Sequence, residues 1–358
     1  SDNTAVFDRR STKPLIINGD MQVAQRGTST ASVTTSGYYT VDRYRFDISS
    51  LGTHTVAQTA SAPDDTGLVN SFRVDCTTAD ASPGASDFMI FSTRLEGQDV
   101  QLFKKGTSYA EKITVAFWVK SNKTGTYIVE IDDNDNARNI NQAYTISSAN
   151  TWEKKVLSFA GDTTGAFGND NGDSFRLLWW LGAGSDFTSG TLETSWASTT
   201  NANRAVGQVN IADSTDNDWS ITGIQMEVGE FDANSIASFQ HESFGDNLAR
   251  CQRYYFNLVE GNSLNFASGA YYNANLFAVH IPFPVTMRSA PSVDKDVGTS
   301  FFNILANNTA DACDDLSITR ATTTGCALDF SGNVSGTQGH GGVMATGNAG
   351  AKIAFESE

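Results

Sequence analysis

Residues 113–120 read ITVAFWVK, and residues 127–131 read YIVEI. In the first run every second residue from Ile113 to Val119 is a large apolar one. A strand places alternate side chains on the same face of a sheet, so one face of this run is expected to be buried. The second run repeats the alternation, and the polar residues 122–125 (NKTG) separate the two. We therefore predict a β-hairpin with one buried face.

Strand signals extend well beyond this segment. Residues 152–159, 175–181 and 219–228 are rich in β-branched and aromatic side chains. Glycine, asparagine, aspartate, serine and threonine dominate the runs between them, such as 161–172 and 198–203, which are typical of loops. Strands at this spacing without intervening helices predict an all-β fold, an antiparallel jelly-roll sandwich.

One short helix is predicted after the strand-rich region. Ser243 and Asp246 have the spacing of a capping box. Apolar residues then recur at spacings of four and three, as one stripe of a helix of three to four turns: Phe244, Leu248, Cys251, Tyr255 and Leu258. A helix this short is marginal alone, so the stripe must be buried. It packs either on its own β domain or at the seam of a homotrimer.

These signals divide the chain of 358 residues into four segments. Residues 1–13 form an N-terminal arm, and residues 14–232 form the jelly roll. Residues 233–259 hold the linker and the helix, and residues 260–358 form a smaller C-terminal β domain. Its tail, residues 331–350, contains many glycines and is predicted to be a loop-rich tip or flexible.

Composition excludes several classes of protein. The formal net charge is −16, whereas binding to nucleic acid requires clustered lysine and arginine. No stretch approaches the ~20 apolar residues that a membrane span requires, and no basic and apolar leader opens the chain, so we expect synthesis in a cytoplasm without a Sec-type signal.

The four cysteines lack a CxxC spacing, so zinc and redox motifs are absent. Cys313 and Cys326 could pair across one hairpin, but buried thiols are favoured.

Catalytic signals are weak, and we expect no enzyme activity. Two carboxylate pairs stand out, Glu96 with Asp99 and Glu227 with Glu230. Glycosidases need two carboxylates that face one sugar, and neighbouring acids along an acidic chain do not meet that requirement. The sequence has no GxSxG elbow and no HExxH spacing among its four histidines.

Two further sets of residues are candidates for binding. On a strand, Trp179 and Trp180 point to opposite faces, so Trp179 would fill the core while Trp180 covers the outer face beside Arg176. An outward tryptophan either packs or seals an interface, or it stacks on a sugar ring. The loop that contains Asp132, Asn134 and Asn136 is rich in oxygen ligands. It is either a solvated turn or a site for a structural calcium ion, and no other cofactor is expected.

Four landmarks, in this order, carry a resemblance to a known class of protein. The first is residues 17–27 (INGDMQVAQRG) with 39–44 (YTVDRY), and the second is residues 114–121 (TVAFWVKS). The third runs from residues 224–229 (IQMEVG) through 239–242 (FQHE) to 248–255 (LARCQRYY), and the fourth is residues 283–291 (FPVTMRSAP). Together they resemble tail-fibre and related virion structural proteins of tailed bacteriophages, many of them marine.

This resemblance implies a jelly roll similar to a carbohydrate-binding module, followed by a small β domain without catalytic machinery. It implies a place on the virion surface, on tail or capsid, after synthesis in the host cytoplasm. The expected function is a tail fibre or receptor-binding protein, as a homotrimer in contact with other virion proteins and with host surface polysaccharide. No extended shaft precedes residue 17, which keeps a capsid decoration or head-fibre protein open as an alternative. A polysaccharide depolymerase and a bacterial carbohydrate-binding module are the remaining alternatives.

Overall fold

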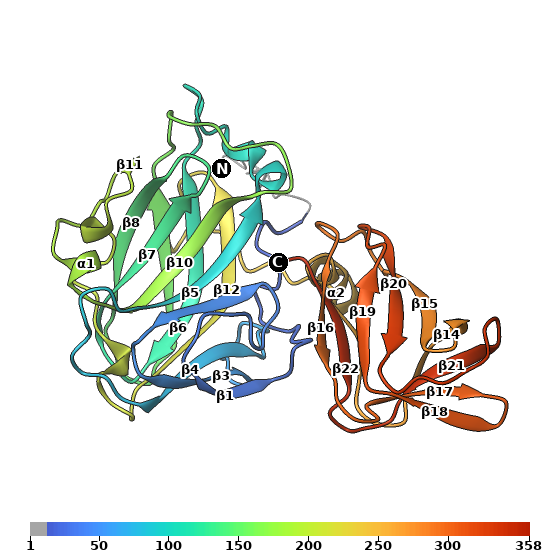
Figure 1. Ribbon diagram of the computed structural model, residues 1–358. Coiled ribbons are helices and arrows are strands. Elements are labelled where there is room, and N and C mark those ends of the chain that lie inside the picture. The colour runs from blue at the N-terminus through green and yellow to red at the C-terminus, as the bar shows by residue number, and fades with distance from the viewer. Residues whose placement is uncertain (1–12) are drawn as a thin grey trace. The chain divides into compact units, whose positions relative to one another are not determined.

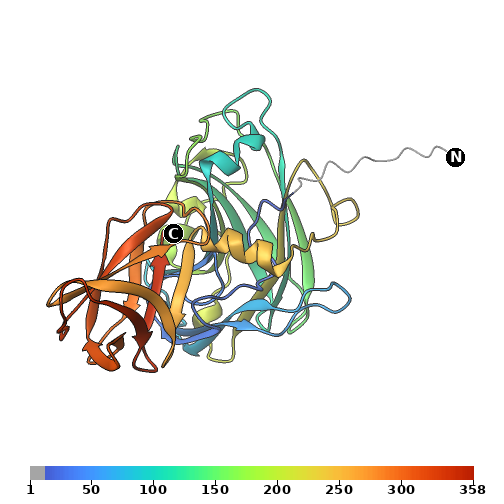
Figure 2. The same ribbon diagram turned by 90° about the vertical axis from the view of Figure 1, so that its right-hand side faces the viewer.

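The computed structural model describes residues 13–358, so of the predicted N-terminal arm only Lys13 lies within the described residues. The chain divides into two compact units, one that ends at Ser243 and one that spans Phe244–Glu358. Each unit is a consecutive stretch of chain, coloured blue to yellow in the first and orange to red in the second (Figures 1 and 2). The boundary falls inside the predicted linker segment 233–259. Antiparallel strands dominate both units, which confirms the all-β class.

Two sheets form the first unit, and within the described residues each has six strands. The strands of the first sheet are, in spatial order, β1 (Ser29–Val33), β3 (Thr53–Thr59), β4 (Ser71–Thr78), β12 (Asp218–Val228), β6 (Ile113–Ser121) and β9 (Glu153–Phe159). Those of the second are β11 (Ala197–Ser198), β8 (Arg138–Ile146), β7 (Gly125–Asp133), β10 (Asp173–Ala183), β5 (Phe88–Glu96) and β2 (Tyr44–Ser49). Neighbours in each sheet are antiparallel, and crossovers between the sheets give a jelly-roll-like sandwich.

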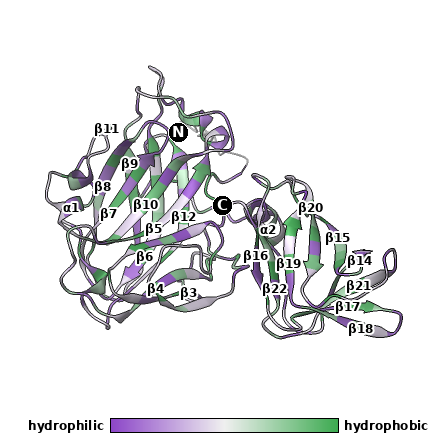
Figure 3. Ribbon diagram, in the orientation of Figure 1, coloured by the Kyte–Doolittle hydropathy of each residue, from purple (hydrophilic) through white to green (hydrophobic). Residues whose placement is uncertain are grey.

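The main core lies between these two sheets. Hydrophilic and hydrophobic residues alternate along the strands (Figure 3), as expected where one face of each sheet is buried. In β10, Leu177, Trp179 and Leu181 point inward and are fully buried, as predicted. Trp179 contacts Phe91 and Phe117 with ring centroids 5.5 Å apart in both cases, so aromatic rings from both sheets meet at the centre.

The predicted hairpin of residues 113–131 is wrong. β6 pairs with β12 and β9 in the first sheet, whereas β7 pairs with β8 and β10 in the second. Both strands direct their apolar residues into the same core, but from opposite sides. The alternation in the sequence is the same in either arrangement, because it reports which side of a strand is buried and not which strand lies beside it.

A second apolar layer covers the outer face of the second sheet. Ile90, Ile128, Leu178, Trp180 and Ala205 form this outer cluster, and all five are buried. Residues 184–210 supply the cover, with α1 (Ser185–Thr188) and the 3₁₀ turn η3 (Asn201–Asn203). The Phe187 ring lies 5.3 Å from that of Trp180, and its carbonyl accepts a 2.9 Å hydrogen bond from the Ala205 amide.

The second unit opens with one helix and continues as β structure. The helix α2 spans Phe244–Gln252 (Figure 2). A three-stranded sheet has the order β13 (Tyr255–Glu260), β22 (Lys352–Glu356) and β16 (Ser292–Asp296). A seven-stranded sheet has the order β18 (Thr309–Cys313), β17 (Phe302–Ala306), β21 (Gly341–Thr346), β14 (Asn265–Asn273), β15 (Leu276–Pro282), β20 (Gly325–Ser331) and β19 (Asp315–Thr319).

Two predictions for this unit need correction. The glycine-rich tail is not only a loop, because β21 lies inside it and pairs with both β14 and β17. The predicted helical stripe is too long, because α2 ends at Gln252 and Tyr255 and Leu258 lie on β13. The backbone N–H and C=O groups of β13 form hydrogen bonds with β22, whereas in a longer helix they would have bonded within the helix. Sequence periodicity alone does not reveal this competition.

The landmark segments meet in two places, one in each unit. In the first, the Asn18 side chain donates to the carbonyls of Val23 (2.9 Å) and Asp42 (3.0 Å), and the Ile224 amide donates to the Gly19 carbonyl (2.9 Å). In the second, the Arg288 amide donates to the Arg253 carbonyl at 2.8 Å. Asn18 and Asp42 are buried. Each set of contacts therefore joins landmark segments within its own unit.

No helix of the described residues is long and apolar enough to cross a membrane. All four cysteines are buried, and Cys313 and Cys326 do not form a disulfide bond with each other.

Candidate functional site

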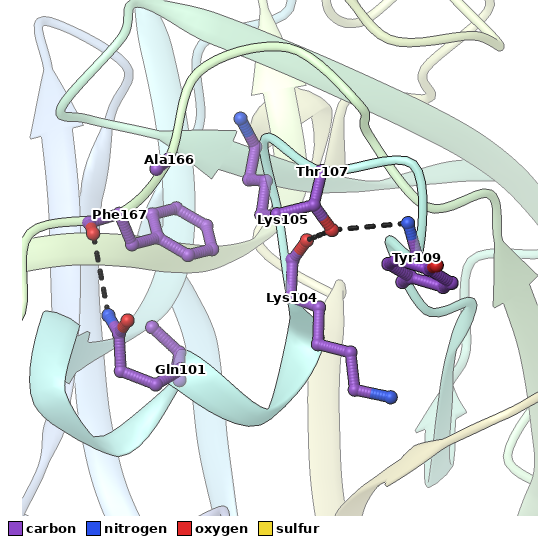
Figure 4. A pocket seen from close by; sticks show the side chains of 8 residues that line it. Gln101, Lys104, Lys105, Thr107, Tyr109, Ala166 and Phe167 are labelled. Carbon is purple, nitrogen blue, oxygen red and sulfur yellow. Dashed lines mark hydrogen bonds between the residues drawn. The ribbon is translucent and has the colours of Figure 1, made fainter.

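A hollow of about 480 Å³ opens between the loop that follows β5 and the loop that precedes β10 (Figure 4). We call it the loop pocket. Residues of the first loop line most of it, and two residues of the second complete it: Val100, Gln101, Lys104, Lys105, Thr107, Tyr109, Ala166 and Phe167.

The first loop is built on buried anchors. After β5 the chain makes two 3₁₀ turns, η1 (Gly97–Asp99) and η2 (Gln101–Phe103). Val100 and Phe103 are buried in the core of the sandwich, which fixes the loop at both ends of η2. Lys104 then adopts a left-handed backbone conformation, φ 50°, and the chain turns back. Gln101 and Leu102, between the two anchors, are thereby held at the surface, facing solvent.

Side-chain hydrogen bonds brace the walls of the loop pocket. Thr107 Oγ1 donates to the Lys104 carbonyl at 2.7 Å and accepts from the Tyr109 amide at 3.1 Å. The Gln101 carboxamide reaches the second loop, where it donates to the Gly168 carbonyl at 2.9 Å. Figure 4 shows its contact with the Phe167 carbonyl. The two loops therefore form one braced structure.

Tyr109 is the most exposed large aromatic residue of the pocket lining, with 77% of its surface accessible. A tyrosine combines an apolar ring face with a hydroxyl that both donates and accepts hydrogen bonds. With Thr107 next to it and Gln101 on the other side of the pocket, such a ring can stack on the apolar face of a sugar whose hydroxyls find polar partners.

A buried charge network lies under the pocket. Lys105 Nζ contacts Asp133 Oδ2 at 2.5 Å and Asp162 Oδ2 at 3.0 Å, and Arg138 Nε donates to Asp162 Oδ2 at 2.7 Å. The side chains of Lys105, Asp133 and Asp162 are at most 4% exposed. Burial raises the pKa of Asp162, but hydrogen bonds from Arg138 and Lys105 outweigh it and lower this pKa below its usual value.

The same lysine fixes the second loop. Lys105 Nζ lies 2.7 Å from the carbonyl oxygens of both Thr164 and Gly165. It also lies 5.2 Å from the ring centroids of Phe167 and Trp196, within the range of a cation–π contact. A single buried ammonium thus ties residues 164–167 to the floor of the pocket.

The predicted tryptophan site is not an open surface. Trp179 and Trp180 are both fully buried, the first in the main core and the second under the cover of residues 184–210. Arg176 pairs with Asp173 at 2.7 Å and lies 3.6 Å from Asp132. Trp180 is therefore not available for sugar stacking, because sequence alternation places it on the outer face but does not show that another segment covers that face.

The predicted calcium loop uses its polar groups internally. Asn134 donates to the Asp173 carbonyl at 2.8 Å, and Asn136 donates to Asp133 Oδ2 at 2.9 Å. Asp132 lies at the end of β7 near Arg176. No group of three acidic, histidine or cysteine side chains that could hold a metal occurs in residues 13–358. The loop therefore has the contacts of a braced turn.

Glu96 and Glu230, one from each of the two carboxylate pairs, have different local partners. Glu96 is buried and accepts a 2.6 Å hydrogen bond from the side chain of Gln98. Glu230 is exposed and forms an ion pair with Lys112. Neither Glu96 nor Glu230 lines the loop pocket.

The residues of the helical stripe have different surroundings. Cys251 is buried in the second unit, whereas Phe244 is 55% exposed and Leu248 is half-buried. Only these three lie on α2. Of the three, only Phe244 and Leu248 keep apolar surface that the predicted seam could use, because Cys251 is buried.

Comparisons with known proteins give structural neighbours but no sequence family. No family model and no curated protein sequence matches the chain. An enzymatically active domain of bacteriophage CBA120 tailspike protein 4 matches 60% of this chain and 21% of its own, at 14% identity and a TM-score of 0.31. A putative sugar binding protein from Bacteroides thetaiotaomicron matches 60% of this chain and all of its own, at 12% identity and a TM-score of 0.31.

A family 11 carbohydrate-binding module of a Clostridium thermocellum cellulase matches 62% of this chain and 98% of its own, at 8% identity and a TM-score of 0.28. The chain thus spans about a fifth of the tailspike chain and nearly the whole of either sugar-binding neighbour. TM-scores near 0.3 do not establish a shared fold, so the architecture rests on the strand pairing described above.

Sequence reasoning missed the loop pocket. Tyr109 stands in the segment 103–109 (FKKGTSY), where an aromatic residue follows glycine, threonine and serine outside any strand pattern. An aromatic residue in a polar loop lacks apolar neighbours in the sequence and is expected to be exposed. This signal could have identified Tyr109 as a candidate binding residue. The partners of Lys105 could not be found in this way, because Asp133 and Asp162 come from other parts of the chain.

Proposed function

We propose that this chain is a non-enzymatic structural protein of a tailed-phage virion surface, a tail fibre or receptor-binding protein whose loop pocket contacts host surface glycans. Exposure of Tyr109 at the mouth of a braced, partly polar hollow is the observation that carries the glycan-binding part. The four sequence landmarks support the virion part. An acidic exterior, at a net charge of −16, suits a particle surface that must remain dispersed.

The geometry of the loop pocket favours binding without rearrangement of its walls. The pocket is a preformed concavity, because buried Val100, Phe103 and Lys105 hold its floor. A preformed site loses little conformational entropy when it binds, so even a few contacts give measurable affinity. Several equivalent sites on one particle would then raise the overall strength of attachment.

Tyr109→Ala tests this function, and Tyr272→Ala is the matched control. Tyr272 is also exposed, at 66%, but belongs to the second unit. On an array of host-surface oligosaccharides the unmodified protein should bind a defined set. Loss of the ring should weaken that binding by about tenfold, equivalent to about 1.4 kcal/mol, while Tyr272→Ala leaves it unchanged. If Tyr109→Ala binds as tightly as the unmodified protein, the loop pocket is not the glycan-binding site.

The place of the protein on the particle is a separate question. A capsid decoration or head-fibre protein would share the same chain features. Immunogold labelling of intact particles with an antibody against the chain should mark the tail. Labelling of the head would instead establish the decoration role.

A further inference from the structure

We propose that the loop pocket accepts uncharged sugar residues and discriminates against uronic, sialic and sulfated sugars. This inference rests on the proposed glycan-binding function of the pocket and specifies its ligand class. The charges of the pocket carry it, because the two charged residues of the lining, Lys104 and Lys105, each already have a carboxylate partner.

Lys105 is not available to an anionic ligand. Its ammonium group is surrounded by Asp133, Asp162 and two backbone carbonyls, and its side chain is 4% exposed. Movement toward a ligand would leave buried carboxylates without their cation, which is strongly unfavourable. Within the network Lys105 and Arg138 balance Asp133 and Asp162, so the floor of the pocket has no net charge.

Lys104 lies at the rim and is neutralised in a different way. Its Nζ lies 2.5 Å from Glu111 Oε1, and the two side chains are 53% and 36% exposed. An incoming carboxylate or sulfate would have to displace Glu111 or approach it closely, and like charges at such distances repel. The net charge of −16 adds a weaker repulsion over the whole chain.

Neutral groups remain for recognition. The exposed Tyr109 ring offers a stacking face and a hydroxyl, and the carboxamide oxygen of Gln101 can accept while its nitrogen braces the second loop. Hydroxyl groups of a neutral hexose both donate and accept, and they match such a lining without a charged partner. Binding should therefore depend little on ionic strength, in contrast to recognition through ion pairs.

Glu111→Gln provides the decisive variant, because it frees Lys104 without a change in the shape of the rim. Glu230→Gln is the matched control: it breaks another exposed lysine–glutamate pair, with Lys112, which does not line the pocket. Affinities would be measured with two oligosaccharides of equal length, one of neutral hexoses and one with uronic acid units, between about 50 and 500 mM NaCl.

The unmodified protein should bind the neutral oligosaccharide at least about tenfold more tightly, with less than about a twofold change across this salt range. Glu111→Gln should gain about tenfold for the acidic oligosaccharide at low salt, and Glu230→Gln should not. Preference of the unmodified protein for the acidic oligosaccharide would overturn the inference and leave the proposed function intact. Absence of any glycan binding at the pocket would overturn both.

Discussion

The indole Nε1 of Trp180 donates a 2.8 Å hydrogen bond to Oε2 of Glu130, and both residues are fully buried although they lie on the outer face of their sheet. Arg204 closes this arrangement, with Nε 2.9 Å from Glu130 Oε1 and its guanidinium 5.2 Å from the centre of the Trp180 ring. The cover over the sheet is thus anchored by a buried ion pair. This face of the sandwich is therefore an interior layer.

Arg204→Met should destabilise the first unit by about 3–5 kcal/mol, because it leaves Glu130 buried without its cation. Glu130→Gln should cost less, since an amide oxygen still accepts the proton of Trp180 and Arg204 keeps some access to solvent. Urea unfolding followed by tryptophan fluorescence checks both, because all six tryptophans lie in the first unit. Adding Glu130→Gln to Arg204→Met should restore part of the loss. Equal costs for the two single variants would contradict the assigned role of the pair.

The Asp132 carboxyl should make stability depend on pH. Burial, together with the neighbouring Glu130, raises the pKa of Asp132 to about 6. The pKa of Asp132 in the folded protein lies above its usual value of 3.8, so folding favours the protonated carboxyl. The stability that this group contributes is fully present below about pH 3.8 and is lost as the pH rises through about 6. Asp132→Asn should therefore gain stability relative to the unmodified protein between about pH 4 and pH 7, by up to about 3 kcal/mol.

Chemical denaturation at a series of pH values checks this gain. Asp186→Asn is the control, because Asp186 is an exposed residue of α1. This variant removes a carboxylate from the surface of the same unit, without the burial that acts on Asp132. A pH-independent difference between Asp132→Asn and the unmodified protein would show that Asp132 ionises normally.

Gly19→Ala should disrupt the contact between the first and third landmarks. A methyl group at Gly19 would lie 2.2 Å from the Ile224 carbonyl oxygen, a backbone atom that cannot easily move. We expect a loss of about 1–3 kcal/mol in the free energy of unfolding of the first unit. Gly168→Ala is the control, because its methyl group would first meet a side-chain atom, Asp170 Oδ2, at 3.3 Å. Wild-type stability of the Gly19 variant would mean that these segments do not pack as described.

We expect no hydrolysis of host polysaccharide. Glu96 is buried and hydrogen-bonded to Gln98, so it does not face a bound sugar together with Asp99. Size-exclusion chromatography of the polysaccharide after prolonged incubation should show an unchanged chain length. Progressive shortening that disappears in a Glu96→Gln variant would reverse this prediction.

The protein is expected to be a homotrimer in which the apolar face of α2 takes part. Phe244 and Leu248 lie one turn apart on this helix and keep exposed apolar surface. Light scattering should report three copies, and the double variant Phe244→Glu and Leu248→Glu should dissociate, since charges are unfavourable at an apolar contact. Asn262→Glu, at another exposed position of the second unit, controls for added charge. A monomer at micromolar concentration would exclude the trimer.

The sequence was informative where the signal was local. Alternation in β10 correctly assigned Leu177, Trp179 and Leu181 to the core, because the pleat of a strand requires that pattern wherever the strand pairs. The start of α2 at Phe244, directly after the predicted N-cap Ser243, was also found from local residues, since helix starts depend on residues close in sequence. Its end did not, because β13 competes for the following residues.

By itself, the sequence determined the class of fold, the side of β6, β7 and β10 that faces the main core, and the acidic character of the protein. Only the tertiary structure decided that β6 and β7 belong to different sheets, that Trp180 is covered, and that Lys105 meets Asp133 and Asp162 under the loop pocket. The physical reason is the same in each case. Burial along one strand follows from its own residues, whereas pairing, covering and charge neutralisation depend on segments that are distant in the chain and that meet only when the sandwich closes.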